Sequence, residues 1–327
     1  MAKRIKVTVV IPLEDRSKYL SETLLSYEKQ TYKNFEVILS STNKFQVKQK
    51  FARLIVDKSL AGDPASKRNK VIDHGKGEII IFNDDDVFVP PGYIERIVEL
   101  FSKSETYGAG GPLLTPPSDN LLKGAGGLVW ESYVGSMGAG VFRSRKMKPR
   151  VVYDYPAANL IIRRDVFVEL GGFESGMYPG EDTKLCLLLS EKYNTGIQYS
   201  PDLFVYHHRC SLFRPHLQQV GRYGTQRGQF ALSYPQTSFT LPYFIPSVLL
   251  LYFLTLPWTA HYSRLVLIPG LLYLAVIIAE AMIFAYKKNI IIAILMVPAV
   301  ITTHMYYGYR FMVSFMRKLI VKIGNSV

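Results

Sequence analysis

The sequence has 327 residues, 48% of them hydrophobic and 20% charged, and a formal net charge of +13. This composition supplies one large core and further apolar segments beyond it. The two cysteines, Cys186 and Cys210, lie far apart without metal-ligand spacing, which excludes a disulfide framework and a cysteine metal site and predicts packing roles.

The N-terminal part of the sequence alternates strand patterns with helix patterns. The strand patterns are short runs of β-branched and aromatic residues, and the helix patterns repeat apolar residues at helical spacing. This alternation predicts an α/β fold with a mainly parallel sheet covered on both faces. Strands are expected at residues 5–11, 35–41, 51–56 and 79–82, and helices at 18–30, 68–74 and 93–103.

Three aspartates directly follow the strand predicted at Ile79–Phe82, in the stretch IIIFNDDDVF. Open α/β sheets bind ligands at the carboxyl ends of their strands. Asp84, Asp85 and Asp86 repel one another there, and a hard divalent cation such as Mn²⁺ or Mg²⁺ relieves that repulsion. We therefore expect a metal site, with a solvated acidic turn as the alternative.

The C-terminal part of the sequence is predicted to associate with a membrane. Almost uncharged runs at Tyr243–Ala260, Leu265–Tyr286 and Asn289–Thr303 approach the roughly 20 residues that a spanning helix needs. Basic residues flank these runs: residues 239–327 hold seven lysines and arginines but one acid, Glu280. This bias predicts anionic membrane lipids, and no nucleic acid, as the partner of the basic residues.

The expected domain boundary lies between residues 238 and 239. Residues 1–238 are expected on the cytoplasmic side of the cell membrane, because no cleavable signal pattern is found and Lys287 and Lys288 follow the second apolar run. Residues 239–327 are expected to form a multi-pass membrane domain, and the charge pattern leaves two or three crossings open. Its tail, residues 311–323, has the pattern of a basic amphipathic helix.

Five short motifs along residues 5–235 resemble those of family-two glycosyltransferases with the GT-A fold. They are VTVVIP, SKRN, GEIIIFNDDD, NLIIRRDVFVELGGF and GED, and they occur in the order seen in that family. The resemblance implies a Rossmann-like domain that binds a nucleotide-diphosphate sugar and a divalent cation, and an inverting hexosyl transfer. Together with the apolar runs, it predicts a lipid-linked or growing glycan as the acceptor.

The resemblance implies roles for the acids by position. Asp84 and Asp86 resemble the family's metal-binding acids, and Asp85 is expected between them, facing the sugar or ribose. Asp182 resembles the general base that takes a proton from the acceptor hydroxyl, with Glu181 as its helper. The structural alternative for Glu181 and Asp182 is that acids are favoured at a helix N-terminus, and both readings can hold together.

The resemblance also implies contacts to the donor. Pro12 and Glu14, after the first strand, resemble the start of the nucleotide pocket, and Arg68 resembles its base- or phosphate-side arginine. The acid that commonly contacts the nucleobase after the second strand is absent from the stretch ILSSTN. Uridine is therefore kept as the default base, and Asp63 is the candidate replacement for that acid.

The stretch QVGRY, close to the first apolar run, resembles the Gln-x-x-Arg-Trp signature of membrane-bound polysaccharide synthases. The resemblance implies that Gln219 and Arg222 contact the donor diphosphate. Tyr223, in the place of tryptophan, is expected to stack on an acceptor sugar, and this departure leaves processivity open. Upstream, one of His207 and His208 is expected either at the metal's third position or in a polar surface pair.

Two other functions stay open from the sequence. A polyprenyl-phosphate sugar synthase needs no general base, because its acceptor phosphate is already ionised, and the GED motif argues against it. A non-catalytic glycan-binding membrane scaffold has no use for both metal acids and a base. A processive synthase needs more helices than this sequence carries, which predicts a homo-oligomer or a partner for that activity.

Overall fold

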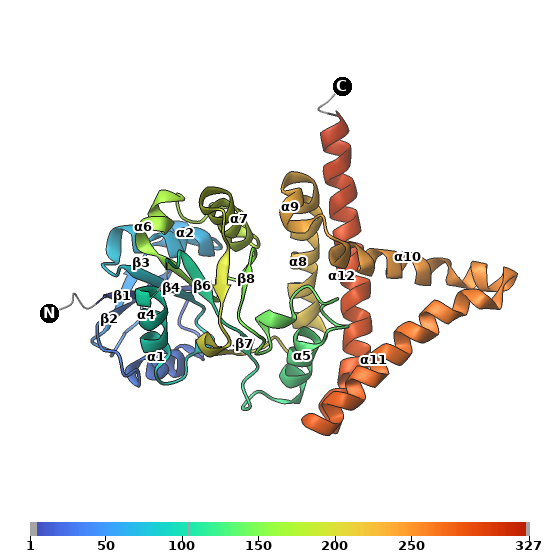
Figure 1. Cartoon of the computed structure of the whole chain (residues 1–327), viewed down its shortest axis with the longest axis horizontal. Coiled ribbons are helices and arrows are strands. Elements are labelled where there is room, and N and C mark those ends of the chain that lie inside the picture. Colours follow the sequence, from blue (N-terminus) through green and yellow to red (C-terminus); the bar gives the residue numbers. More distant parts are fainter. Residues whose placement is uncertain (1–4, 104, 325–327) are drawn as a thin grey trace. The chain divides into compact units, whose positions relative to one another are not determined.

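The computed structural model describes residues 5–103 and 105–324, which form two compact units (Figure 1). The first unit contains the chain up to Leu114 and residues 145–208, and the second contains residues 115–144 and the chain from Arg209 onward. The expected boundary after residue 238 stays a prediction. The unit that holds the apolar helices also includes two segments, 115–144 and 209–238, that precede that boundary.

Within the described residues, the first unit contains an eight-stranded sheet. Its strands are β1 (Val7–Leu13), β2 (Phe35–Ser41), β3 (Ala52–Val56), β4 (Ile79–Asn83), β6 (Gly108–Gly110), β8 (Arg150–Val152), β9 (Asn159–Arg163) and β10 (Ile197–Tyr199). The strand order is β3-β2-β1-β4-β9-β6-β10-β8.

The sheet is mainly parallel, as expected, with two reversed strands: β6 and β10 also pair in parallel, so six of its eight strands run in the same direction. The first four strands are parallel, as predicted. β9, however, runs antiparallel to both β4 and β6, and β8 runs antiparallel to β10, so the sheet is mixed. β9 is buried on both faces like a parallel strand, so its burial pattern does not reveal its direction.

The helices of the first unit confirm most predicted elements and shift their ends. They are α1 (Leu20–Glu28), α2 (Pro64–Asn69), α3 (Val71–His74), α4 (Tyr93–Lys103), α6 (Arg164–Glu169) and α7 (Glu181–Tyr193), with short 3₁₀ turns at Lys58–Leu60 and Pro201–Leu203. The single helix expected at 68–74 is two short helices. α2 begins earlier because Asp63 caps it and Pro64 occupies its first turn.

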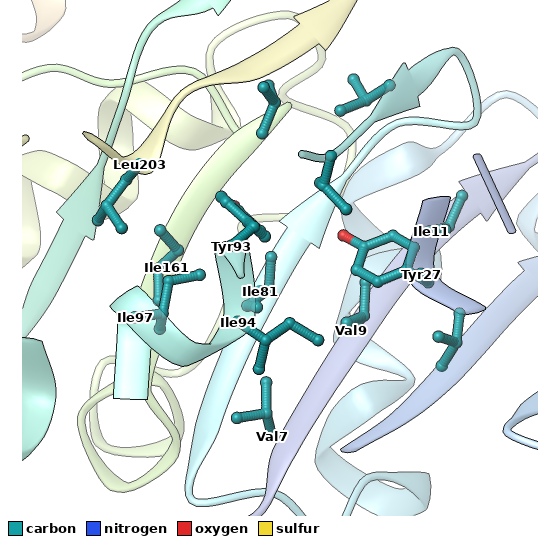
Figure 2. Packing of buried hydrophobic residues seen from close by; sticks show 14 of the residues in the cluster. Val7, Val9, Ile11, Tyr27, Ile81, Tyr93, Ile94, Ile97, Ile161 and Leu203 are labelled. Atoms are coloured by element: carbon teal, nitrogen blue, oxygen red, sulfur yellow. The ribbon is translucent and has the colours of Figure 1, made fainter. Parts of the chain in front are cut away.

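One hydrophobic core packs α1 and α4 against the sheet. Val9 and Ile11 of β1 and Ile81 of β4 pack with Tyr27 of α1 and Ile94 of α4, and all five are fully buried (Figure 2). Burial of this kind contributes about 1.5–3 kcal/mol for each large apolar side chain. The packing fixes the register of β1 and β4, and therefore fixes where their carboxyl ends lie.

A second, three-stranded sheet lies in the same unit. Its strands, in the order β5-β11-β7, are β5 (Val87–Phe88), β11 (Val205–His207) and β7 (Leu113–Leu114). β11 runs antiparallel to β5, with His207 opposite Val87. Residues 205–207 and 87–88 are far apart in the sequence, so this pairing brings a distant histidine beside the acidic triplet.

The second unit is helical. It contains α5 (Leu121–Glu131), α8 (Arg214–Ser233), α9 (Pro235–Ser238), α10 (Leu241–Tyr262), α11 (Ile268–Lys287) and α12 (Ile290–Gly324), with 3₁₀ turns at Val141–Arg143 and Arg264–Leu267. Among residues 5–103 and 105–324, three helices are long and apolar enough to cross a membrane: 241–262, 264–287 and 290–324. The tail expected as a separate helix at 311–323 is continuous with the third apolar run, as part of α12.

Candidate active site

The carboxyl ends of two neighbouring parallel strands bring acidic residues to one edge of the sheet. β1 and β4 pair in parallel, so Glu14 and Asp84 follow strand ends at the same edge. Asn83, the last residue of β4, is fully buried, accepts a hydrogen bond from the Tyr27 hydroxyl and donates one to the Ala158 carbonyl at 2.7 Å. These contacts fix the backbone from which the acidic triplet emerges.

Two of the three aspartates lie beside a histidine. Ligand atoms of Asp84, Asp86 and His207 all lie within 4.8 Å of one another, and Asp86 Oδ1 is 3.2 Å from His207 Nε2. The histidine comes from β11, which pairs with the strand that follows the triplet. Two carboxylates and one imidazole suit a divalent cation, so these three side chains fit a metal site.

The next residue, His208, has different contacts. Its Nε2 lies 2.8 Å from Glu22 Oε2, and its ring stacks on Tyr19 with the centroids 4.0 Å apart. Its backbone N–H donates to the Asp86 carbonyl at 3.1 Å, and its side chain is buried. Of the two histidines that the sequence left open, His207 therefore lies at the acids, while His208 anchors the backbone next to them.

Asp85, the middle aspartate, is held by a separate set of contacts. Its carbonyl accepts a hydrogen bond from Thr23 Oγ1 at 2.9 Å, and its carboxyl hydrogen-bonds Ser17. Burial raises the pKa of the Asp85 carboxyl to about 6; Ser17 opposes the rise, and the charges of Asp86 and Asp84 add to it. The pKa of this carboxyl therefore lies above that of a free aspartate, and its expected contact with the sugar or ribose stays a prediction.

Arg68 joins the two acidic motifs. Its Nη2 forms an ion pair with Asp84 Oδ1 at 2.8 Å, and its Nη1 forms one with Glu181 Oε1 at 2.8 Å. The arginine is only 4% exposed, and its pair with Glu181 is buried on both sides, whereas the Asp84 side chain is 31% exposed. Each arm of the guanidinium fork serves one carboxylate, which a lysine cannot reproduce. The contact with both motifs was not predicted, and the expected contact with the donor stays a prediction.

Helix α7 begins with the two acids of the GED motif. Gly180, with a φ of 123°, forms the turn before the helix and donates its N–H to Glu181 Oε2 at 3.0 Å. Asp182 accepts hydrogen bonds from the N–H groups of Thr183 at 2.7 Å and Ala157 at 3.2 Å. Both acids lie in the first helical turn, where the helix dipole favours negative charge.

Burial makes these acids stronger bases than free carboxylates. It raises the pKa of Glu181 to about 7, with Asp182 adding to the rise and Arg68 opposing it. Burial also raises the pKa of Asp182, and the negative charge of Asp154 adds to this rise. Asp154 was missed by the sequence analysis because only the fold brings it near α7. A carboxylate with a pKa raised toward the working pH is suited to accepting a proton from a hydroxyl.

Glu14 forms an ion pair with Lys67, a residue inside the SKRN motif to which the sequence analysis assigned no role. Glu14 Oε1 lies 2.5 Å from Lys67 Nζ and 2.9 Å from the N–H of Gly62. The lysine side chain is 2% exposed, whereas the Glu14 side chain is 58% exposed. The second carboxylate oxygen accepts a longer hydrogen bond from Thr42, at 3.3 Å, so it has acceptor capacity for a ligand.

The other two residues predicted near the nucleotide have structural partners. Asp63 caps α2 and accepts hydrogen bonds from the Ser66 N–H at 3.1 Å and from the Ser175 hydroxyl at 2.5 Å. Pro12 lies inside β1, opposite Ser40 of β2. The contacts of Asp63 and Pro12 with the nucleotide stay predictions.

Gln219, Arg222 and Tyr223 lie on α8, in the second unit. Arg222 and Tyr223 are exposed, and Tyr223 makes an edge-to-face contact with Trp130 of α5, with the centroids 6.1 Å apart. The sequence analysis did not single out Trp130, because one tryptophan in a glycine-rich apolar stretch has no spacing that links it to α8. The expected contacts of these α8 residues with diphosphate and acceptor stay predictions.

The fold of the chain is similar to that of a known structure over most of both chains. The mannosyltransferase PcManGT from Pyrobaculum calidifontis, in complex with GDP-Man and Mn²⁺, matches it with a TM-score of 0.56 and 17% sequence identity. The match covers 96% of this chain and 88% of that chain. The class that this fold defines is the GT-A nucleotide-sugar-binding fold, here followed by apolar helices.

Sequence comparison identifies the family within that class. A family model described as glycosyl transferase family 2 matches residues 8–171, half of the chain, and the chain belongs to this family. Two relatives described as pre-mycofactocin glycosyltransferase, from Mycobacterium tuberculosis strains CDC 1551 / Oshkosh and ATCC 25618 / H37Rv, are 24% identical over 173 residues. These matches span 53% of this chain and 36% of the length of each relative.

Proposed function

We propose that this protein is a membrane-anchored, metal-dependent, inverting glycosyltransferase that moves a hexose from a nucleotide-diphosphate sugar to a lipid-linked or growing glycan acceptor. The observation that carries the proposal is the cluster of Asp84, Asp86 and His207, which Arg68 connects to the acidic start of α7. Family membership supports it, as does the presence of a nucleotide sugar and Mn²⁺ in the similar mannosyltransferase structure.

Asp84, Asp86 and His207 are the residues that would hold the cation. Mn²⁺ fits this set better than Mg²⁺, because Mg²⁺ prefers oxygen ligands and the set contains an imidazole nitrogen. When bound, the cation supplies neutralising charge for the leaving diphosphate. The protein's own contribution is to hold Asp84 in place through Arg68 and to hold the Asp86 backbone through the His208 N–H.

Asp182 is proposed as the general base. Two backbone N–H groups orient its carboxylate, and its raised pKa increases its affinity for the acceptor proton. As it takes that proton, the acceptor oxygen attacks the anomeric carbon from the face opposite the diphosphate, which inverts the configuration. Glu181 acts as the helper by binding Arg68 beside the base. General base catalysis typically contributes about 10²–10⁴ in rate.

Glu14 is proposed to accept a hydrogen bond from the nucleobase. Its carboxylate is exposed and is held from behind by the buried Lys67. A UDP-sugar stays the default donor, although a carboxylate also accepts hydrogen bonds from guanine, so both nucleotides belong in a test. The other residues proposed to contact donor or acceptor are Pro12, Asp63, Arg68, Asp85, Gln219, Arg222 and Tyr223.

The long apolar helices support the proposal of a lipid-linked acceptor. Three helices have the length and composition to cross a membrane, and the basic residues around them are those expected at a cytoplasmic face. We place the catalytic unit on the cytoplasmic side of the cell membrane, where nucleotide sugars are available. Growth of a long polymer by this chain would require a homo-oligomer or a partner with further helices.

The proposal can be tested by reconstituting the full chain in lipid with Mn²⁺ or Mg²⁺. Release of nucleoside diphosphate is measured from a panel of UDP- and GDP-sugars, with a lipid extract as the acceptor source. The variants are Asp84→Ala and Asp182→Asn, and Glu99→Gln is the control, because Glu99 is an exposed acid of α4 that pairs with Lys103. We expect release from one donor that needs metal, is lost in both site variants and persists in the control.

Each other result points to a different function. Transfer to a polyprenyl phosphate that survives Asp182→Asn would indicate a polyprenyl-phosphate sugar synthase, since that acceptor needs no base. Retention of anomeric configuration in the product, measured by NMR, would contradict the inverting mechanism. Absence of release from every donor, with glycan binding intact, would favour the non-catalytic membrane scaffold.

A further inference from the structure

The three long apolar helices of the second unit differ in how much of each is covered by protein. In its most apolar stretch, 11% of α10 is buried, as is 11% of the helix 264–287, against 33% of α12. α10 and α11 expose large apolar side chains along their length, among them Leu254, Trp258, Leu271 and Met282. Helices of 22 and 24 residues are about 33–36 Å long, enough to cross a hydrocarbon core of about 30 Å.

α12 has a different length and charge. Its 35 residues extend about 52 Å, well beyond the thickness of a hydrocarbon core. Its second half carries four basic residues: Arg310, Arg317, Lys318 and Lys322. The uncharged stretch 290–309 is long enough to cross a membrane by residue count alone, so its neighbours in the fold decide where it lies.

The helix that packs along the middle of α12, from Thr303 to Phe315, is polar. α8 contains three arginines and four glutamines, and its exposed face includes Arg222. Its contacts with α12 begin where His216 Nε2 lies 2.9 Å from Thr303 Oγ1, and they continue to Phe315, which packs against Gly228. A helix of this composition is costly in hydrocarbon. The part of α12 that precedes its contacts with α8, residues 290–302, is about 20 Å long and too short to cross.

Close backbone approach makes α8 and α12 a fixed pair. A Cβ on Gly224 would lie 2.8 Å from the Tyr307 carbonyl oxygen, and one on Gly228 would lie 2.4 Å from the Phe311 carbonyl oxygen. Arg310 Nε also donates to Thr225 Oγ1 at 3.1 Å. No larger residue fits at these glycines, because the backbones of α8 and α12 lie in contact there. A movement of α8 away from α12 would disrupt this packing.

Both helices of the α10–α11 hairpin contact α12. Near the start of α10, Ser247 Oγ donates to the Gly308 carbonyl at 3.0 Å. Toward the end of α11, Ile277 and Phe284 share a buried cluster with Met296 of α12. The turn between α10 and α11 is exposed, with Tyr262 at 87%, and Figure 1 shows this turn at the far end of the hairpin.

The segment that follows α5 contacts α11 through Glu280, near the end of α11 that packs on α12. This carboxylate lies seven residues before Lys287, the end of α11. It accepts hydrogen bonds from the Ser132 hydroxyl and from the N–H groups of Tyr133 at 2.8 Å and Val134 at 3.1 Å. Three donors satisfy the one acid of α11, so it is compatible with a position near the boundary between headgroups and hydrocarbon.

We propose that α10 and α11 cross the membrane as one hairpin and that α12 lies along the cytoplasmic membrane surface, on anionic phospholipid. Its basic side chains meet the headgroups, while its exposed apolar side chains enter the interface. This places Lys287, Lys288 and the basic tail of α12 on one side, as the distribution of positive charge favours. The large apolar residues that α12 exposes include Ile290, Ile291, Ile294, Tyr309, Met316, Ile320, Val321 and Ile323.

The position of α12 at the membrane surface also favours one class of acceptor. This inference rests on the proposed function. α8 carries Gln219, Arg222 and Tyr223 and is fixed to α12, so these residues lie at the level of the lipid headgroups. A lipid-linked acceptor presents its polar head at that level while its chain stays in the bilayer. A soluble glycan has no lipid chain that would hold it at that level.

The topology can be tested by labelling single cysteines in the full chain within intact cells, using a membrane-impermeant maleimide. Ser263→Cys marks the hairpin turn, Asn289→Cys the start of α12 and Val321→Cys its end; all three positions are exposed. The unmodified chain measures the background from Cys186 and Cys210. We expect labelling of Ser263→Cys from outside, and labelling of the other two only after the membrane is opened.

Other labelling patterns overturn the proposal. Outside labelling of Val321→Cys without Asn289→Cys would mean that α12 crosses the membrane. Equal accessibility of Ser263→Cys and Asn289→Cys would mean that the hairpin does not cross. Outside labelling of both α12 positions, without Ser263→Cys, would contradict the cytoplasmic assignment.

A second measurement tests the depth of α12 and does not depend on labelling from one side. Ile294 and Ile320 are each 64% exposed and lie 26 residues apart on this helix. Nitroxide labels at Ile294→Cys and Ile320→Cys should show similar, shallow depths by oxygen and nickel accessibility. One deep and one aqueous label would overturn the interfacial position. Neither experiment measures activity, so failure of the proposed transferase function would not affect the result.

Discussion

The acids of the candidate site in the first unit and Glu280 in the second unit have different kinds of neighbours. In the first unit, Asp84 and Glu181 share one buried cation, Arg68, and burial and neighbouring charge raise the pKa values of Asp85, Glu181 and Asp182. In the second unit, the carboxylate of Glu280 receives three hydrogen-bond donors from residues 132–134. A carboxylate that accepts several hydrogen bonds stabilises the packing around it. Carboxylates that lie close together with too few positive neighbours have a raised affinity for a cation or a proton.

Removal of the proposed base is expected to have the largest effect. Asp182→Asn keeps the size of the side chain but removes its proton acceptor, so we expect the turnover number to fall by about 10²–10⁴. The measurement is the steady-state rate of nucleoside diphosphate release with saturating donor and acceptor. A rate within a few-fold of the unmodified protein, matching the Glu99→Gln control, would contradict the assignment.

Removing a proposed metal ligand is expected to have the next largest effect. Asp86→Asn is preferable to a change at Asp84, because Asp86 is not bound to Arg68. We expect a loss of about 10²–10³ in rate at low Mn²⁺, the scale found when one group that stabilises developing charge is lost. Part of the rate should return at high Mn²⁺, and Mn²⁺ binding can be measured directly by electron paramagnetic resonance. Unchanged Mn²⁺ affinity would contradict the ligand assignment.

Two adjacent cations of α2 give a matched pair for stability. Arg68→Met leaves the buried Glu181 without its cation and is expected to lower the free energy of unfolding by about 3–5 kcal/mol. Lys67→Met is the control, because its partner Glu14 stays largely in water, and it should cost about 1 kcal/mol or less. Denaturation followed by fluorescence gives both values, and equal losses would show that burial of the partner does not matter here.

The acid of the second unit should have a smaller effect. Glu280→Gln places an amide among the three donors, and its N–H₂ group cannot replace an acceptor oxygen. We expect a loss of about 1–3 kcal/mol of stability, the cost of leaving buried donors without partners. Ser132→Ala, which removes one donor and keeps the carboxylate, is the control and should cost less. A larger effect on donor turnover than on stability would contradict a structural role for Glu280.

The smallest expected effect is a shift in pH dependence. Because the proposed base Asp182 can accept a proton only when it is ionised, kcat/KM should rise with pH through the raised pKa of the Glu181 and Asp182 pair. Burial favours the protonated folded form, so the stability contribution of Glu181 is greatest below its unfolded pKa and decreases as pH rises toward about 7. Asp182→Asn should lower the pKa of Glu181 by removing a negative neighbour. A flat profile between pH 5 and about 8 would contradict the raised pKa.

Much of the fold follows from local sequence patterns. The strand predicted at 35–41 and the helix predicted at 93–103 have the observed bounds, and three apolar helices lie where uncharged runs were read. The reversal of β9 was not predictable in this way, since a strand buried on both faces has the same pattern in either direction. The continuous α12 was also missed, because no residue between the third apolar run and the tail marks a helix as continuing or ending.

Sequence alone determined the chemistry of the candidate site: which acids follow a strand, which open a helix, and which segments are too apolar for water. Those properties depend on neighbours within a few residues. The tertiary structure decided how they combine. The pairing of β11 with β5 places His207, and not His208, beside the acids. Arg68 contacts both Asp84 and Glu181, and Glu181 lies 113 positions after Arg68 in the sequence. Contacts at that separation depend on the register of the whole sheet, which no local pattern contains.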